Sequence, residues 1–138
     1  MAFYISGCEQ DTFGFAEAFA AGLKGGECVA VRGDLGAGKT VFAKGLAAGL
    51  GIKELVTSPT FVIMNVYKGA TLKLYHFDMY RLNAAQAENL GFHEYFGEKD
   101  AVCLIEWPEN VFAMLPKGTI SLEIKRLDEN TREIVVNE

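Results

Sequence analysis

Arginine is scarce in this chain, and its overall charge balance is acidic. The 138 residues include four arginines, and the formal net charge is −5, with a sequence pI of about 5.1. A protein that grips nucleic acid needs clustered lysine and arginine to meet the phosphates. The composition therefore argues against this chain being the main contact with a nucleic acid, although net charge leaves room for a small basic face.

Cysteine is also scarce, and its spacing excludes two classes of protein. Cys8, Cys28 and Cys103 are odd in number and far apart in the sequence, so neither a disulfide framework nor a metal cluster is indicated. Cys28 and Cys103 fall inside apolar runs, where we expect small core residues. Unpaired cysteines of this kind favour a reducing compartment.

Long apolar runs are absent as well. The first residues, Met-Ala-Phe-Tyr-Ile-Ser, lack the basic region and the apolar core of a secretory signal. No stretch approaches the ~20 apolar residues that span a membrane. We therefore expect a cytoplasmic protein without a membrane partner.

The chain has the composition of one packed domain. Half of its residues are hydrophobic, with 10 Phe and 5 Tyr, and the 22% of charged residues form no long block of one sign. A chain of this length buries roughly two-thirds of its unfolded surface. We predict a single domain spanning residues 1–138, without disorder, internal repeats or linkers.

Residues 33–40, Gly-Asp-Leu-Gly-Ala-Gly-Lys-Thr, fit the pattern G-x-x-x-x-G-K-[ST] of a phosphate-binding loop. The glycines let the backbone curl so that successive N–H groups point at an anion, and the following helix directs its positive end at the same charge. Lys39 can reach the β- and γ-phosphates, and the Thr40 hydroxyl can ligate Mg²⁺. The residues expected to bind the phosphates are Gly33, Leu35, Gly36, Ala37, Gly38, Lys39 and Thr40.

Hydrophobic periodicity predicts the elements around this loop. Strands are predicted at residues 3–6, 28–31, 60–67, 72–77, 101–105, 119–127 and 131–137, and helices at 11–23, 41–50 and 84–96. Turns at 68–71 and 128–130 predict two hairpins. The fold class is α/β: a P-loop NTPase-like domain with a mixed sheet, a parallel core, attached antiparallel hairpins and flanking helices.

Two acidic residues follow apolar strands directly. Asp78 comes after Leu-Tyr-His-Phe, and Glu106 comes after Ala-Val-Cys-Leu-Ile. In phosphate-loop enzymes a carboxylate at a strand end completes the Mg²⁺ shell, and a second carboxylate can orient or deprotonate the attacking water. Both are candidate site residues, and the pattern leaves open which one ligates the metal.

Other positions have weaker signals. Residues 57–60, Thr-Ser-Pro-Thr, are either a turn or a mobile loop whose hydroxyls sense the γ-phosphate. His76 is expected to form a local hydrogen bond, and Trp107 adjoins Glu106 and is expected near the nucleotide. The chain has no N/T-K-x-D element of the kind that reads guanine, which favours ATP over GTP.

Four elements in this order resemble the TsaE (YjeE) family, and together they span most of the chain. They are GDLGAGKT at 33–40, TSPTF at 57–61, HFDMYRL at 76–82 and LIEWP at 104–108. The resemblance implies a small Mg²⁺-dependent ATPase for N6-threonylcarbamoyladenosine at position 37 of tRNA. It also implies work with a TsaB–TsaD complex and contact with tRNA only through partners. We expect slow turnover without them, because no arginine that could act as a catalytic finger follows the loop.

The resemblance also implies roles for individual residues. Thr40 and Glu106 would hold Mg²⁺, and Asp78 would act on or orient water. Thr60 or Thr57 would sense the γ-phosphate, and Thr12 aligns with a position near the base.

Two other functions fit the same fold. A small-molecule kinase needs an acceptor site and an arginine-rich lid, for which four scattered arginines offer little support. A nucleotide-gated interaction module would bind ATP and switch the segment at 57–61, with hydrolysis incidental to its function.

Overall fold

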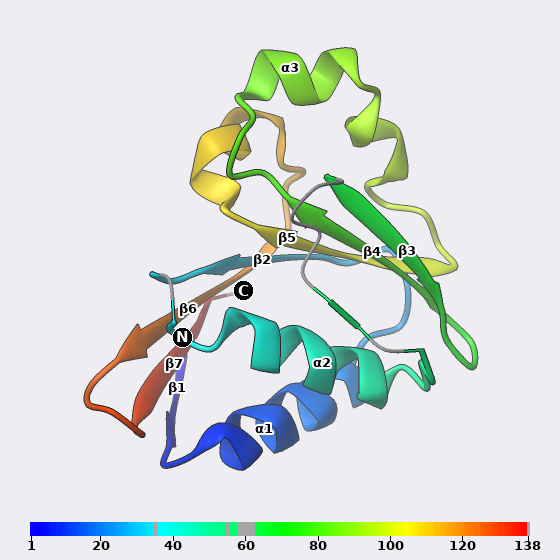
Figure 1. Cartoon of the computed structure of the whole chain (residues 1–138). Coiled ribbons are helices and arrows are strands. Elements are labelled where there is room, and N and C mark those ends of the chain that lie inside the picture. Colours follow the sequence, from blue (N-terminus) through cyan, green and yellow to red (C-terminus); the bar gives the residue numbers. More distant parts are fainter. Residues whose placement is uncertain (35, 55, 58–62, 138) are drawn as a thin grey trace.

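The computed structural model describes residues 1–34, 36–54, 56–57 and 63–137, which form one seven-stranded sheet with helices on both faces (Figure 1). The strands are β1 (Ala2–Ser6), β2 (Cys28–Arg32), β3 (Met64–Lys68), β4 (Lys73–Asp78), β5 (Ala101–Glu106), β6 (Ile120–Arg126) and β7 (Arg132–Asn137). The helices are α1 (Glu9–Ala21), α2 (Lys39–Gly49) and α3 (Ala84–Asn89), together with the 3-10 helices η1 (Phe92–Tyr95) and η2 (Pro108–Met114).

The strand order is β1-β7-β6-β2-β5-β4-β3. β2 runs parallel to both β5 and β6, and β4 runs parallel to β5. The pairs β3/β4, β6/β7 and β1/β7 are antiparallel. The predicted mixed sheet, with a parallel core and antiparallel hairpins, is therefore confirmed.

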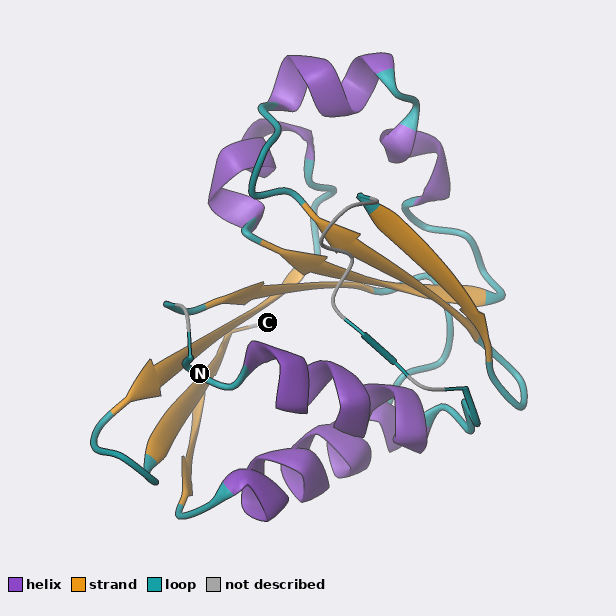
Figure 2. Ribbon diagram, in the orientation of Figure 1, coloured by secondary structure: helices purple, strands orange, loops and turns teal. Residues whose placement is uncertain are grey.

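Side chains alternate between two hydrophobic clusters, one on each face of the sheet. On β5, Val102 and Leu104 pack toward α1 and α2, whereas Cys103 and Ile105 pack toward α3, η1 and η2. Figure 2 shows α1 and α2 on one side of the sheet and the shorter helices on the other. Every residue of β5 is buried, as predicted for a strand covered on both faces.

α1 and α2 lie unusually close because α2 presents glycine to α1. A Cβ added to Gly45 would lie 2.4 Å from the carbonyl oxygen of Phe13, and one added to Gly49 would lie 2.5 Å from that of Glu17. Gly49 is also the last residue of α2. The close packing fixes α2, and with it the loop that precedes α2, against the sheet.

The predicted helix at 84–96 is wrong. α3 ends at Asn89, and the separate η1 begins at Phe92, because Gly91 between them has a left-handed backbone with φ of +78°. An apolar pattern at helical spacing continues across this break, so periodicity does not detect it. Phe92 instead turns its ring onto Phe77 of β4, with the ring centroids 5.2 Å apart.

Strand and helix ends differ from the prediction elsewhere by a few residues. α1 begins at Glu9 rather than at residue 11, and α2 begins at Lys39, inside the glycine-rich motif. β3 begins at Met64, and residues 60–62 of the predicted strand lie outside the described residues. None of the helices in the described ranges combines the length and the apolar character that crossing a bilayer requires.

Candidate functional site

The glycine-rich loop connects β2 to α2 and has the backbone that its sequence predicts. Gly36 and Gly38 have φ of +79° and +109°, a region that residues with a Cβ rarely adopt. The N–H of Ala37 donates to the carbonyl of Asp34 at 3.0 Å, which closes a tight turn before the helix. The loop thus delivers the chain directly into the N-terminus of α2, where backbone N–H groups have no partner within the helix.

Lys39, the first residue of α2, is buried with 7% of its surface exposed. Its Nζ has no hydrogen-bond partner among the described residues and lies 4.0 Å from the centroid of the Trp107 ring. A buried ammonium is costly unless a partner compensates it, and an aromatic face compensates only part of that cost. An anion at this position would complete its coordination.

Asp78 and Glu106 lie side by side at the carboxyl end of the sheet. They are register partners on the parallel strands β4 and β5, and Glu106 also lies opposite Val31 of β2, two residues before the glycine-rich motif begins. Alternation along each strand turns both acids to the face that α1 and α2 cover, because Leu74 and Leu104 occupy the same phase. The two carboxylates and Lys39 therefore converge at one edge of the sheet.

The environment of Asp78 favours its protonated form. Burial is the main cause that raises the pKa of this carboxyl, and the negative charge of Glu106 adds to the effect. A hydrogen bond from the Tyr80 N–H to Oδ1, at 3.0 Å, and the charge of Lys39 act in the opposite direction. A carboxylate held in this way can accept a proton from water more readily than an exposed aspartate can.

His76 is fully buried, and its Nε2 donates a hydrogen bond to Glu106 Oε2 at 2.5 Å. The expected local hydrogen bond is thus corrected: the partner lies 30 residues away on the neighbouring strand. The imidazole fixes the orientation of the Glu106 carboxylate, in the way that outer partners orient metal-binding groups. The signal in the sequence was the position of His76, two residues before Asp78 on one face of β4.

Trp107 closes the site beside these acids. It has φ of +57°, and its ring lies 4.9 Å from that of Tyr80, between centroids. The Asn110 amide donates to the carbonyls of Met79 and Tyr80, both at 3.0 Å, which ties the segment after β4 to the segment after β5. The aromatic lid over Lys39 is therefore held from both strands that carry the acids.

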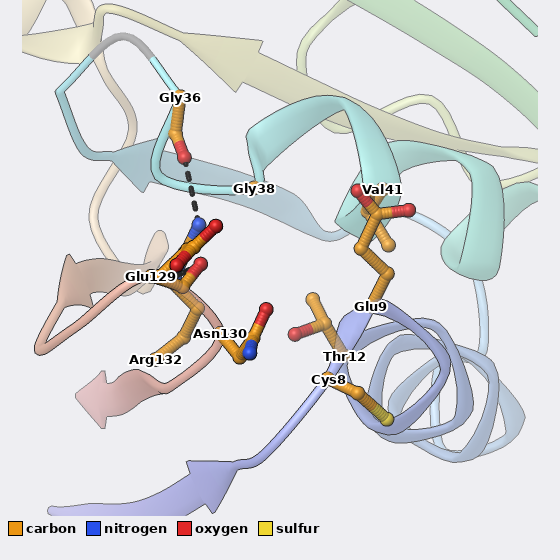
Figure 3. Close-up of a pocket in the computed structure, with 9 residues that line it drawn as sticks. All are labelled: Cys8, Glu9, Thr12, Gly36, Gly38, Val41, Glu129, Asn130 and Arg132. Carbon is orange, nitrogen blue, oxygen red and sulfur yellow. Dashed lines mark hydrogen bonds between the residues drawn. The ribbon is translucent and has the colours of Figure 1, made fainter.

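A pocket of about 150 Å³ opens on the other side of the glycine-rich loop (Figure 3). It is lined by Thr12 of α1, by Asn130 of the β6–β7 turn, and by Gly36 and Gly38 of the glycine-rich loop. The Thr12 hydroxyl is 2.7 Å from that of Ser6, which orients the start of α1. Thr12 and the glycines of the loop therefore line one cavity, and the position of Thr12 near a base stays a prediction.

Arg132 is a site residue that the sequence interpretation missed. It begins β7, yet its guanidinium reaches the carbonyl oxygens of Gly36 and Ala37 in the glycine-rich loop. Arg132 is separated from Ala37 by 95 positions in the sequence and from Gly36 by 96, so no local sequence pattern predicts these contacts.

The remaining predicted residues have the following positions. Thr40 is exposed in the first turn of α2. The Thr57 carbonyl accepts hydrogen bonds from Asn65 and Tyr67 of β3, so its described contacts are with the sheet edge rather than with the glycine-rich loop. Leu35 and Thr60 lie outside the described residues.

A strand, a glycine-rich loop and a helix, followed by acids at the ends of neighbouring parallel strands, define the class of P-loop nucleotide-binding proteins. Within that class the chain belongs to the TsaE family. The family model described as "Threonylcarbamoyl adenosine biosynthesis protein TsaE" matches residues 7–134.

Individual relatives agree with the family assignment. The chain is 44% identical to the tRNA threonylcarbamoyladenosine biosynthesis protein TsaE of Bacillus subtilis, over 91% of this chain and 78% of that protein. It is 42% identical to the TsaE protein of Treponema pallidum, over 96% of this chain and 97% of that protein. The crystal structure of Bacillus subtilis YdiB superposes with a TM-score of 0.84 at 38% identity, covering 96% of this chain and 82% of that one.

Proposed function

We propose that this protein binds and hydrolyses ATP with Mg²⁺, and that it is required for N6-threonylcarbamoyladenosine at position 37 of tRNA. The observation that carries the proposal is the buried Lys39 ammonium, which has no hydrogen-bond partner among the described residues and lies at the edge where Asp78 and Glu106 meet. The names of the relatives supply the pathway.

The residues present fit a magnesium nucleotide. Mg²⁺ in such sites is held by one or two carboxylates, a hydroxyl and the phosphates themselves. Thr40 and Glu106 would hold the ion, and the His76 hydrogen bond keeps Glu106 in one orientation. When bound, Mg²⁺ neutralises charge on the β- and γ-phosphates.

The chain's own groups account for the hydrolytic step. Backbone N–H groups of Gly36 and of residues 38–40, together with the Lys39 ammonium, bind phosphate oxygens and stabilise the charge that spreads over the γ-phosphate. Asp78 orients a water molecule for attack on the γ-phosphorus and accepts its proton. The bond from that phosphorus to the bridging oxygen breaks, and ADP and phosphate are the products.

Three of the four arginines have partners in the protein other than the expected nucleotide. Arg32 lies 3.9 Å from Glu123, Arg126 donates to the carbonyl of Asp128, and Arg132 binds backbone carbonyls. An arginine that stabilises the transition state accelerates phosphoryl transfer by roughly 10³–10⁵. We therefore propose that a TsaB–TsaD complex stimulates a slow basal ATPase and that tRNA binds through these partners.

The experiment is a phosphate-release assay on the purified chain, alone and with TsaB, TsaD and tRNA, with Asp78→Asn as the variant. We expect slow Mg²⁺-dependent hydrolysis that the partners accelerate. Asp78→Asn should lower the rate by about 10²-fold or more while Mg-ATP still binds in calorimetry. An Asp78→Asn protein that binds ATP without hydrolysing it and still supports modification would indicate a nucleotide-gated module instead, and a phosphorylated metabolite would indicate a kinase.

A further inference from the structure

Each nitrogen of the Arg132 guanidinium donates to a backbone carbonyl. Nε donates to the carbonyl of Ala37 at 2.9 Å, and Nη2 donates to that of Gly36 at 3.1 Å. Nη1 donates to the carbonyls of Asp128 at 3.0 Å and Glu129 at 3.3 Å. One side chain therefore joins the β6–β7 turn to the glycine-rich loop, as the dashed line to Gly36 in Figure 3 shows in part.

These hydrogen bonds determine which way the loop's N–H groups point. In a trans peptide the C=O and the following N–H point in opposite directions. Arg132 holds the carbonyls of Gly36 and Ala37 toward itself, so the N–H of Gly38, which follows the Ala37 carbonyl, is directed away from Arg132. Glycine can adopt many backbone conformations, so Gly36 and Gly38 do not hold the loop in one geometry by themselves. The loop therefore needs a constraint from another part of the protein.

We propose that Arg132 is a positioning residue for nucleotide binding, which holds the phosphate loop in its binding geometry through two backbone carbonyls. The inference rests on the proposed function, since it requires that the loop bind phosphate. It assigns Arg132 no contact with the phosphates, because Nε, Nη1 and Nη2 all donate to carbonyl oxygens.

The turn that supports Arg132 is itself built rigidly. Asp128 Oδ1 accepts the N–H of Asn130 at 2.9 Å and that of Thr131 at 2.8 Å, and the Leu127 N–H donates to the Thr131 carbonyl at 2.9 Å. The same two N–H groups hold the pKa of Asp128 below its ordinary value. Asn130 of this turn faces Thr12 across the pocket, so the constraint on the loop and the wall of the pocket come from one hairpin.

The hairpin offers a matched control. Arg126 is the register partner of Arg132 on β6, and it also donates to the carbonyl of Asp128, at 3.3 Å. Arg126→Ala and Arg132→Ala remove the same charge from the same hairpin, but only Arg132→Ala removes hydrogen bonds to Gly36 and Ala37. Arg132→Lys keeps the charge without the fork that bridges two carbonyls.

The test is calorimetric titration of each folded variant with Mg-ATP and with inorganic triphosphate, well below its melting temperature. We expect Arg132→Ala and Arg132→Lys to lower the affinity for both ligands by about tenfold or more. Arg126→Ala should change neither affinity by more than about twofold. Both ligands should weaken by a similar factor, because the constraint acts on the loop and not on the nucleoside.

Each other result overturns the inference. Restored affinity in Arg132→Lys would mean that Arg132 contributes charge alone. A lower affinity for Mg-ATP with an unchanged affinity for triphosphate would mean that Arg132 acts on the part of the site that binds the nucleoside. Equal affinities for Arg132→Ala and Arg126→Ala would mean that Arg132 does not position the loop. If Arg132→Ala does not fold, Arg132→Lys decides the question. Failure of the wild-type protein to bind either ligand would instead refute the proposed function.

Discussion

The two faces of the sheet are built from the same strands but have different contents. On the face covered by α1 and α2, each of β4 and β5 passes from apolar residues to a polar group at its carboxyl end, where His76, Asp78 and Glu106 lie. On the opposite face the same strands present Tyr75, Phe77 and other residues of an apolar cluster in which aromatic rings pack against one another. Because successive side chains of a strand point to opposite faces, the polar candidate site residues lie on one face of the sheet and the aromatic packing residues lie on the other.

The covering helices differ in the same way. α1 and α2 are long and approach each other closely at glycines of α2, whereas α3, η1 and η2 are short, and η1 packs the rings of Phe92 and Tyr95 against Phe77 of β4. The first arrangement fixes a phosphate loop rigidly, and the second supports the sheet from behind. Substitutions of the polar residues at the carboxyl ends of β4 and β5 should therefore affect ligand binding before stability, and substitutions of aromatic residues on the second face should do the reverse.

The largest effect is expected for Lys39→Ala. Loss of the charged hydrogen bonds to phosphate should weaken Mg-ATP by about 100-fold or more, as measured by calorimetry. The melting temperature should not fall, because removal of the ammonium also removes the cost of burying it without a hydrogen-bond partner among the described residues.

Lys44→Ala is the control for this variant, since it removes an exposed lysine from the same helix. Lys44→Ala should leave the Mg-ATP affinity and the melting temperature unchanged. A Lys39→Ala protein that melts well below Lys44→Ala would show that the Lys39 contact with Trp107 is mainly structural, and the separation between the two faces would then fail at this point.

His76 tests whether a fully buried residue on the first face also acts on function. His76→Asn should raise the Mg²⁺ concentration required for hydrolysis by about tenfold or more, because Glu106 loses the group that orients it. His76→Gln should stay within about threefold of the wild-type protein, since the longer amide can donate from a position close to Nε2. Equal behaviour of the two variants would exclude an orienting role for the Nε2 hydrogen bond.

Phe92→Ala tests the opposite face. Phe92 is half-buried on η1 and packs edge-to-face against Phe77, so its truncation should lower the free energy of unfolding by about 2 kcal/mol in urea. Mg-ATP affinity should not change. Phe112→Ala, which removes a ring that is 74% exposed, should leave the unfolding free energy within about 0.5 kcal/mol of wild type. A loss of affinity in Phe92→Ala would show that the aromatic face transmits strain to the site.

How far the sequence predicts this molecule depends on how local each feature is. The phosphate loop is contiguous, and the two acids each follow an apolar run, so the motif and strand periodicity predicted the fold class and indicated two acids that lie together at one edge of the sheet. The contacts of His76 with Glu106 and of Arg132 with Gly36 depend on strand order and register, which periodicity does not specify. The break at Gly91 was missed because it depends on a single backbone angle inside an apolar pattern.

The smallest effects are expected for substitutions in the α1–α2 layer. The stability of this layer and that of the opposite, aromatic face should respond to opposite changes in side-chain volume. The aromatic face should lose stability when atoms are removed, whereas this layer should lose it when one is added. Gly45→Ala would bring a methyl group to 2.4 Å from the Phe13 carbonyl oxygen and should cost about 1–2 kcal/mol in urea denaturation. Gly14→Ala is the matched control, because it lies in α1 with no atom within 4 Å of the added Cβ and should stabilise the protein by about 0.5–1 kcal/mol. If Gly45→Ala also stabilises the protein, helix propensity outweighs close packing at this contact, and the small residues would not be what holds α2 and the phosphate loop in place.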